Sequence, residues 1–275
     1  MTTPDNGIFT TLRSAIRAEE PVALATVISG DGIGTDGVEA GMKLLVRPDG
    51  TTLGDLGNPD LNRVIVRDSI GELSAGTSGV RHYGPRGQAR QDDLDIFIES
   101  FARPPQMLIF GAVDFTAALC RVAKVLGYRV TVCDARPVFA TKQRFPYADD
   151  VVVDWPNRLL EKVGPDLAVR DAICVLTHDP KFDVPAVMSA LQTQAGYIGA
   201  MGSRRTTEDR NRRLLDEGVD PEALARVMAP IGLDIGGRTP EETAISVCAE
   251  IIALQSGRIA PSLRDAEGDI HRSSP

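Results

Sequence analysis

Apolar and polar residues in the first third of the chain alternate with the periods of short helices and strands. The pattern predicts a helix, a strand, a hairpin, a second helix and a further strand over residues 8–19, 22–28, 42–53, 58–72 and 94–98. Pro48-Asp49-Gly50 has the composition of the hairpin turn, and Asn58-Pro59 is suited to begin the second helix. We therefore expect residues 1–103 to form a small α+β domain.

After Arg103-Pro104-Pro105 the pattern changes to strands that are apolar at nearly every position and alternate with helices. The apolar runs lie at residues 107–110, 130–133, 151–153, 172–176 and 197–198. Strands that are apolar on both faces are typical of a parallel sheet with helices on both sides. We therefore expect an α/β class: residues 104–256 form a Rossmann-like parallel-sheet domain, which ends with a helix after the capping box Thr239-Pro240-Glu241-Glu242. Residues 257–275 consist mostly of Gly, Pro, Ser and charged residues and are expected to be a disordered tail.

The composition is that of an ordinary globular protein and narrows the choice of partners. The 275 residues are 43% hydrophobic and 25% charged, and the net charge of -8 corresponds to a pI near 5.0. An acidic chain argues against nucleic acid and anionic membranes, and no apolar run is long enough to span a bilayer. The scattered cysteines and three histidines have no zinc-site spacing. We expect a cytoplasmic protein with reduced thiols, no metal site and a small ligand.

The first strand of the second domain leads into a turn that resembles a dinucleotide-binding fingerprint. Gly111 follows this strand, and Asp134 closes the next strand 23 residues later, close to the separation of about 20 expected of a ribose-binding acid. Only the first glycine of the motif is present. Val113 replaces the second and places a side chain where a pyrophosphate would approach. The residues fit either a nucleotide or pterin site or a scaffold with an altered pocket. Arg136 can grip a phosphate or pair with Asp134.

Thr177 and His178 follow the most apolar run of the second domain. They are therefore expected at the carboxyl end of a strand, where ligands of open α/β sheets bind. His178 can exchange a proton with a polar ligand, or it can pack beside Asp179 while that residue caps the next helix.

A glycine-rich turn after residues 197–198 leads into a basic helix. Gly202 and Ser203 precede Arg204 and Arg205, at a helix start where free amides favour an anion. The alternatives are an anionic ligand and a solvated basic helix balanced by its own acids. Because the ends of parallel strands meet at one edge, we expect one cleft to collect Gly111, Asp134, Thr177, His178, Gly202, Ser203 and Arg204.

The second domain also contains a series of motifs whose order is more specific than any one of them. They are Asp134-Ala135-Arg136, Arg144-Phe145-Pro146-Tyr147-Ala148-Asp149, Thr177-His178-Asp179, Tyr197-Ile198-Gly199-Ala200-Met201-Gly202-Ser203-Arg204-Arg205, Pro230-Ile231-Gly232-Leu233-Asp234-Ile235-Gly236 and Thr239-Pro240-Glu241-Glu242. Over residues 105–256 this series closely resembles the XdhC/CoxI family of xanthine dehydrogenase accessory proteins. The first domain is similar more loosely, through residues 21–28, 41–46 and 54–57.

The resemblance implies a maturation factor for molybdenum hydroxylases rather than a catalyst. Such a protein binds molybdenum cofactor (molybdopterin) and delivers it, after sulfuration, to an apo-enzyme such as xanthine or carbon monoxide dehydrogenase. The partners implied are the apo-molybdenum hydroxylase, a cofactor-sulfurating enzyme and a second copy of the chain. With no catalytic residue and no metal ligand, the cofactor-binding residues expected are Gly111, Asp134, Arg136, Thr177, His178, Gly202, Ser203, Arg204 and Arg205.

The chain departs from the family pattern at two places. Family members often have Gly-Gly-Cys-Glu in the first domain, where this chain reads Gly57-Asn58-Pro59-Asp60 and offers no thiol. They often begin the second domain's turn with Gly-x-Gly-His, where this chain reads Gly111-Ala112-Val113-Asp114. The alternatives are an NAD(P)-dependent oxidoreductase that uses Asp134, with His178 as acid or base, and a nucleotide-sensing Rossmann module.

Overall fold

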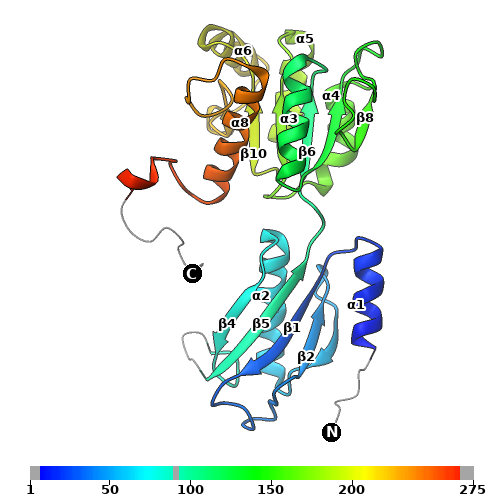
Figure 1. The fold of residues 1–275 in the computed structure, drawn as a ribbon, viewed down its shortest axis with the longest axis vertical. Coiled ribbons are helices and arrows are strands. Elements are labelled where there is room, and N and C mark those ends of the chain that lie inside the picture. Colours follow the sequence, from blue (N-terminus) through cyan, green and yellow to red (C-terminus); the bar gives the residue numbers. More distant parts are fainter. Residues whose placement is uncertain (1–6, 89–92, 267–275) are drawn as a thin grey trace. The chain divides into compact units, whose positions relative to one another are not determined.

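The computed structural model describes residues 7–88 and 93–266 and divides into two compact units, Met1–Arg103 and Pro104–Pro275 (Figure 1). Each unit has its own sheet and its own hydrophobic core. Of the tail expected from residue 257 onward, residues 257–266 are described and contain a single 3-10 turn, η2 (Leu263–Asp265). Residues 267–275 lie outside the described part of the chain.

The first unit is a five-stranded antiparallel sheet with one helix on each face, in strand order β3-β2-β1-β5-β4 (Figure 1). Its elements are α1 (Ile8–Arg17), β1 (Val22–Ser29), β2 (Lys43–Val46), β3 (Thr52–Asp55), α2 (Pro59–Ala75), β4 (Gly79–Tyr83) and β5 (Leu94–Phe101). Ala23, Ala25 and Val27 face the core that contains α2, whereas Val22 and Leu24 face the core that contains α1. The central strand β1 is therefore apolar at successive positions because both of its faces are covered.

The second unit is a parallel sheet of six strands in the order β11-β10-β9-β6-β7-β8. The strands are β6 (Gln106–Phe110), β7 (Arg129–Cys133), β8 (Asp150–Val152), β9 (Ala172–Val175), β10 (Tyr197–Ala200) and β11 (Val227–Met228). The helices are α3 (Asp114–Val125), α4 (Pro156–Val163), η1 (Gly164–Asp166), α5 (Pro180–Leu191), α6 (Arg204–Asp216), α7 (Pro221–Leu224) and α8 (Pro240–Gln255). This confirms the expected α/β class with a Rossmann-like sheet.

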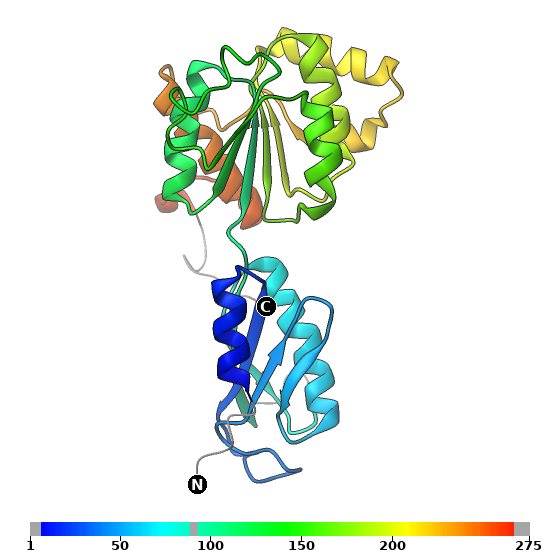
Figure 2. The same cartoon turned by 90° about the vertical axis from the view of Figure 1, so that its right-hand side faces the viewer.

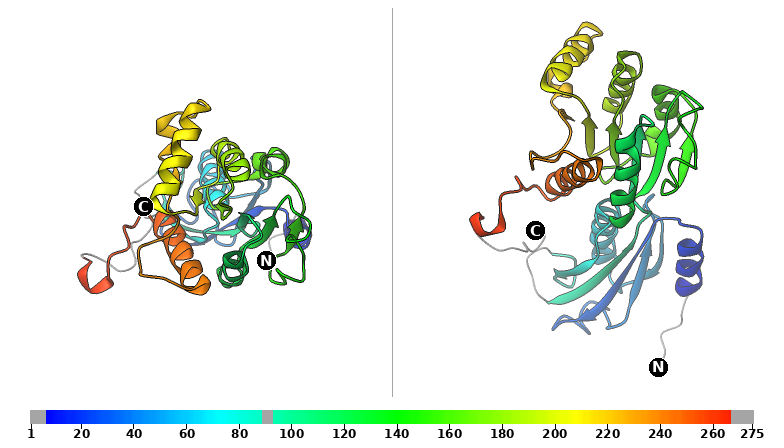
Figure 3. Two further views of the ribbon diagram at one scale, coloured as in Figure 1. Left: turned by 90° about the horizontal axis from the view of Figure 1, so that it is seen from above. Right: turned by 45° about the horizontal axis from the view of Figure 1, so that its top comes forward.

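Helices cover both faces of this parallel sheet (Figures 2 and 3). α3 and α8 contribute to the core on one face, and α4, α5 and α6 contribute to the core on the other face. β9 at the centre is buried at every position. Such a strand has no polar face, and this explains why residues 172–176 form the most apolar run of the domain.

Three strands differ from the sequence expectation. β4 was not predicted, because Arg81 and His82 make it polar and its alternation is that of an edge strand with one exposed face. β11 was also missed, since two residues at the other sheet's edge leave no periodic signal. β10 continues through Gly199 and Ala200, which had been expected in a loop. Among the described residues, no helix has the length and apolar character needed to cross a membrane.

The capping box of α8 provides a test of the local structure. Thr239 accepts a hydrogen bond from the Glu242 amide at 3.2 Å, and the Glu242 carboxylate accepts from the Thr239 amide at 3.0 Å. We expect Thr239→Ala to lower the free energy of unfolding of the second unit by about 1 kcal/mol. Thr239→Ser keeps the capping hydroxyl and should leave that free energy unchanged. Trp155, the only tryptophan of the chain, packs on Phe182 within this unit, so its fluorescence during urea unfolding measures the change. Equal losses in the two variants would contradict a hydroxyl cap.

Candidate functional site

The residues expected at the site follow strands whose carboxyl ends lie at one level. In the parallel register Phe110 pairs with Cys133 and with Val175, and Val175 pairs with Ala200. The next amides continue these ladders: Gly111 N donates to Cys133 O at 2.9 Å, and Met201 N donates to Val175 O at 2.8 Å. The turns after β6, β7, β9 and β10 therefore start at the same edge of the sheet.

Gly111 makes the tightest of these turns. Its φ is +112°, and a Cβ at this position would come within 2.9 Å of the Thr177 backbone nitrogen. A side chain at position 111 would therefore separate the ends of β6 and β9. Thr116 stands where the motif's third glycine would be, is fully buried, and donates its hydroxyl hydrogen to Gly111 O.

Asp134 is almost completely used by protein donors. Its carboxylate accepts from Ala112 N at 2.8 Å, and from Nε and Nη2 of Arg136 at 2.9 and 2.8 Å. Only 5% of this side chain is exposed, and burial raises its pKa, but these hydrogen bonds outweigh burial and hold the pKa below its usual value. Of the two roles considered for Arg136, the structure shows the pairing with Asp134, and 44% of the Arg136 side chain is exposed.

The turn after β9 presents an exposed histidine next to a helix cap. Thr177 is buried, whereas His178 is exposed. Asp179 accepts a hydrogen bond from Lys181 N at 3.1 Å and so caps α5. The capping role considered for Asp179 is thus present, and His178 does not pack into the core beside it.

The turn after β10 places two arginines in the first turn of α6. Ser203 is the N-cap and accepts from Thr206 N at 3.1 Å. Arg204 and Arg205 are exposed, and within residues 7–88 and 93–266 neither guanidinium has an ion-pair partner. Two unbalanced cations near the positive end of a helix dipole make this place attractive to an anion.

A buried ion pair that the sequence did not suggest lies beneath the turn after β10 and fixes its position. Arg210 of α6 and Asp183 of α5 are 2% and 3% exposed, and their nearest charged atoms lie 3.6 Å apart. Arg210 Nη1 also donates to Met201 O at 3.0 Å, so the pair ties α5 and α6 to the strand end. Burial raises the pKa of Asp183 and lowers that of Arg210, and the two charges oppose these shifts. Neither Asp183 Oδ1 nor Arg210 Nε has a hydrogen-bond partner in the described structure.

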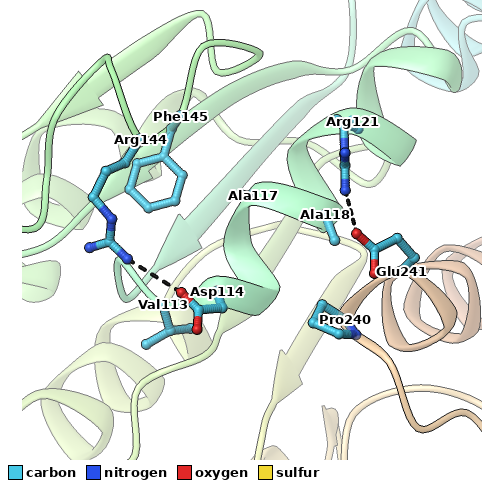
Figure 4. A pocket seen from close by; sticks show the side chains of 9 residues that line it. All are labelled: Val113, Asp114, Ala117, Ala118, Arg121, Arg144, Phe145, Pro240 and Glu241. Carbon is cyan, nitrogen blue, oxygen red and sulfur yellow. Dashed lines mark hydrogen bonds and ion pairs between the residues drawn. The ribbon is translucent and has the colours of Figure 1, made fainter.

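A pocket of about 340 Å³ lies beside the start of α3 (Figure 4). α3, the loop after β7 and the start of α8 line it, through Val113, Asp114, Ala117, Ala118, Arg121, Arg144, Phe145, Pro240 and Glu241. Asp114 and Arg144 lie on one side, and Arg121 with Glu241 lies on the other. None of these was named as a site residue from the sequence, although Arg144 and Phe145 belong to a motif that carried the family resemblance.

The thiols of the chain are held in the protonated form. All four cysteines are buried, and burial raises the pKa of Cys120, Cys133 and Cys248 to about 12. A thiol with such a pKa offers almost no thiolate near neutral pH. Among the described residues, no group of three or more His, Cys, Asp and Glu side chains could hold a metal ion.

Family models match both units. The model of the XdhC Rossmann domain matches residues 107–251, which is more than half of the chain. The chain belongs to the XdhC family. A second model, described as the XdhC and CoxI family, matches residues 15–84 and so places the first unit in the same family as the second.

Two curated relatives are similar to this XdhC-family chain over somewhat more than half of its length. A Bacillus subtilis protein named as a probable xanthine dehydrogenase subunit is 33% identical over 158 residues, 58% of this chain and 45% of that protein. An Escherichia coli protein named molybdenum cofactor insertion chaperone PaoD is 31% identical over 163 residues, 59% of this chain and 44% of that protein. The matched part is thus about half of the length of either relative.

A solved structure supports the fold of the XdhC-family chain. A crystal structure described as a xanthine dehydrogenase from Bacillus halodurans superposes with a TM-score of 0.54 at 22% identity. The superposition covers 92% of this chain and 97% of the crystallised chain.

The pairing of Arg136 with Asp134 predicts a pH-dependent stability. A carboxylate with a lowered pKa contributes stability that is present above the unfolded pKa and is lost as the pH falls through the folded pKa. We expect Arg136→Gln to lower the free energy of unfolding at pH 7 by about 1 kcal/mol. The loss is modest because Arg136 is partly exposed. Urea unfolding followed by Trp155 fluorescence should show this difference shrinking below about pH 4. A difference independent of pH would contradict the pairing as its source.

The Asp183–Arg210 pair predicts a non-additive double substitution. Arg210→Met leaves a buried, unpaired Asp183 and should lower the free energy of unfolding by about 3 kcal/mol. Adding Asp183→Val removes the stranded charge and should recover at least half of that loss, measured with the same fluorescence assay. If the second substitution deepens the loss instead, the two side chains are not coupled as a pair.

Proposed function

We propose that this XdhC-family chain binds molybdenum cofactor at the carboxyl edge of its parallel sheet and delivers it to a molybdenum hydroxylase. The observation that carries the proposal is the paired match to XdhC family models, together with a relative named as a molybdenum cofactor insertion chaperone. The relative named as a probable xanthine dehydrogenase subunit supports an accessory role toward that class of enzyme.

The residues at the edge of the sheet fit the anionic part of such a cargo. The cofactor has a phosphate group, and two unpaired guanidinium groups beside a helix start are suited to hold one. Gly202 leaves room there, because a Cβ at this position would crowd Thr206 at 3.1 Å. Gly202, Ser203, Arg204 and Arg205 would therefore hold the phosphate. Gly111, Thr177 and His178 would border the same edge.

The proposed role needs binding and release, not catalysis by this chain. When bound in its final enzyme, the cofactor supplies the metal chemistry of hydroxylation. This chain's part is to neutralise the phosphate and to shield the cargo from water. Its four cysteines are buried in the described structure, so the hold proposed at the exposed turns is non-covalent.

The arginines of α6 give the first test. Protein would be titrated with molybdenum cofactor released from a molybdoenzyme, and binding would be followed by the cofactor's absorbance. We expect the double variant Arg204→Gln/Arg205→Gln to bind at least about tenfold more weakly, since it loses two charge-assisted contacts. Arg212→Gln/Arg213→Gln removes the same charge from the same helix further from its start and should bind as the unchanged chain does.

Parallel titrations with NAD(H) and NADP(H) separate the alternatives. Tight nicotinamide binding with hydride transfer, and no binding of the cofactor, would favour the NAD(P)-dependent oxidoreductase. Nucleotide binding without hydride transfer would favour the nucleotide-sensing module. Asp134 is already saturated by Arg136 and Ala112, which makes it a poor ribose acceptor in either case.

Delivery is tested with the recipient enzyme. Cofactor-loaded protein should activate an apo-molybdenum hydroxylase, and a pull-down from the native cytosol should enrich such an enzyme or a cofactor-sulfurating enzyme. Enrichment of unrelated metabolic enzymes alone would contradict the proposal. The cytoplasmic location and self-association of the chain stay predictions.

A further inference from the structure

The pocket beside α3 is separate from the residues assigned to the phosphate, and its lining is of a different kind. About half of its wall is apolar, from Val113, Ala117 and Ala118 of the α3 region and from Pro240 at the start of α8. Phe145, which is 1% exposed, also belongs to the lining and is fixed in the core. A pocket of this volume and lining suits a flat ring system better than a small ion.

Arg144 enters the pocket in a fixed position. Its Nη1 donates to Ala112 O at 3.1 Å, and its guanidinium lies 5.4 and 5.6 Å from the ring centres of Phe145 and Phe139. Its Nη2 points toward Asp114 but stays 3.6 Å from the carboxylate, which is too long for a hydrogen bond. Arg144 thus presents a donor in a defined place.

Asp114 is the complementary acceptor. Its side chain is 92% exposed, and the distance to Arg144 leaves its carboxylate oxygens without a short contact to that partner. On the other side of the pocket Arg121 and Glu241 form a 2.5 Å pair that links α3 to α8. The charged groups that line the pocket are therefore two cations and two anions, and their charges cancel.

A pocket whose charges cancel does not attract a phosphate. It favours a neutral ligand with hydrogen-bond donors and acceptors on one edge. We propose that this pocket binds the aminopyrimidinone edge of a flat heterocycle, the edge that pterin and guanine share. Asp114 accepts from the ring N–H and amino groups, and Arg144 Nη2 donates to the ring carbonyl. As the place of the pterin ring of molybdenum cofactor, this assignment rests on the proposed function.

Pterin itself is the probe, and its fluorescence reports binding to the full chain. We expect saturable binding that weakens at least about tenfold in Asp114→Asn, because an amide removes one acceptor and adds a competing donor. Ala117→Leu fills the pocket while keeping a good helix former, and should also weaken pterin binding at least tenfold. Asp150→Asn is the matched control and should leave binding unchanged. Asp150 is a half-buried acid that pairs with Arg129, and both residues lie at the opposite ends of the strands.

Two further ligands test the edge that is recognised. 1,3-Dimethyllumazine has the same ring system without the N–H donors and should bind at least tenfold more weakly than pterin. Guanosine has the same edge, and binding that is lost in the same variants would support the recognised class while assigning a nucleotide as its source. The assignment would be overturned if pterin showed no saturable binding, or if Asp114→Asn and Ala117→Leu bound pterin as strongly as the unchanged chain. It would also be overturned if dimethyllumazine bound as strongly as pterin.

Titrating the same variants with molybdenum cofactor separates the two proposals. Cofactor binding that is identical in all variants, without pterin selectivity, would overturn the pocket assignment and leave the proposed function standing. Pterin selectivity without any cofactor binding would support the pocket and contradict the proposed function. Trp155 fluorescence during urea unfolding verifies that each variant is folded.

Discussion

The common register of the parallel strands is the constraint on which the rest of the second unit depends. Phe110, Cys133, Val175 and Ala200 are paired at one level, and the amides that follow them extend the same ladders. A shift of one strand by one residue would exchange its two faces and move its turn away from the edge. Both faces of β9 are fully buried, so a shift of this strand would also disturb the close packing of its side chains against the cores on the two sides of the sheet.

The edge is strengthened by polar groups that the protein has already satisfied. Asp134 joins the turn after β6 to the turn after β7 through Ala112 and Arg136, and Arg210 joins the turn after β10 to α5 through Asp183. These carboxylates serve the structure of the turns, whereas Arg204 and Arg205 of α6 are exposed and have no ion-pair partner among the described residues. A site built in this way has a rigid base and a charged rim.

Sequence reasoning found what local periodicity and strand-end topology determine. The runs at 107–110 and 172–176 marked buried parallel strands, and Thr239 with Glu242 marked the start of α8. It did not find the pair of Asp183 and Arg210, since their 27-residue separation brings them together only through the packing of α5 on α6. The pocket was not predicted for the same reason: α3, the loop after β7 and α8 are far apart in the sequence and meet only in the folded structure. The edge strands β4 and β11 depend on a neighbouring strand, not on a periodic pattern of their own.

The chemistry of the described residues favours a reversible hold over a permanent one. A thiolate could bind a metal tightly, but the cysteines are buried and their thiols stay protonated near neutral pH. On the proposed function, the cargo is then held by guanidinium contacts to its phosphate and by contacts of its ring with the pocket beside α3. Exposed charge contacts of this kind contribute modestly and are weakened by water. A recipient enzyme that encloses the cofactor can therefore bind it more strongly, and the difference in affinity drives transfer without a chemical step on this chain.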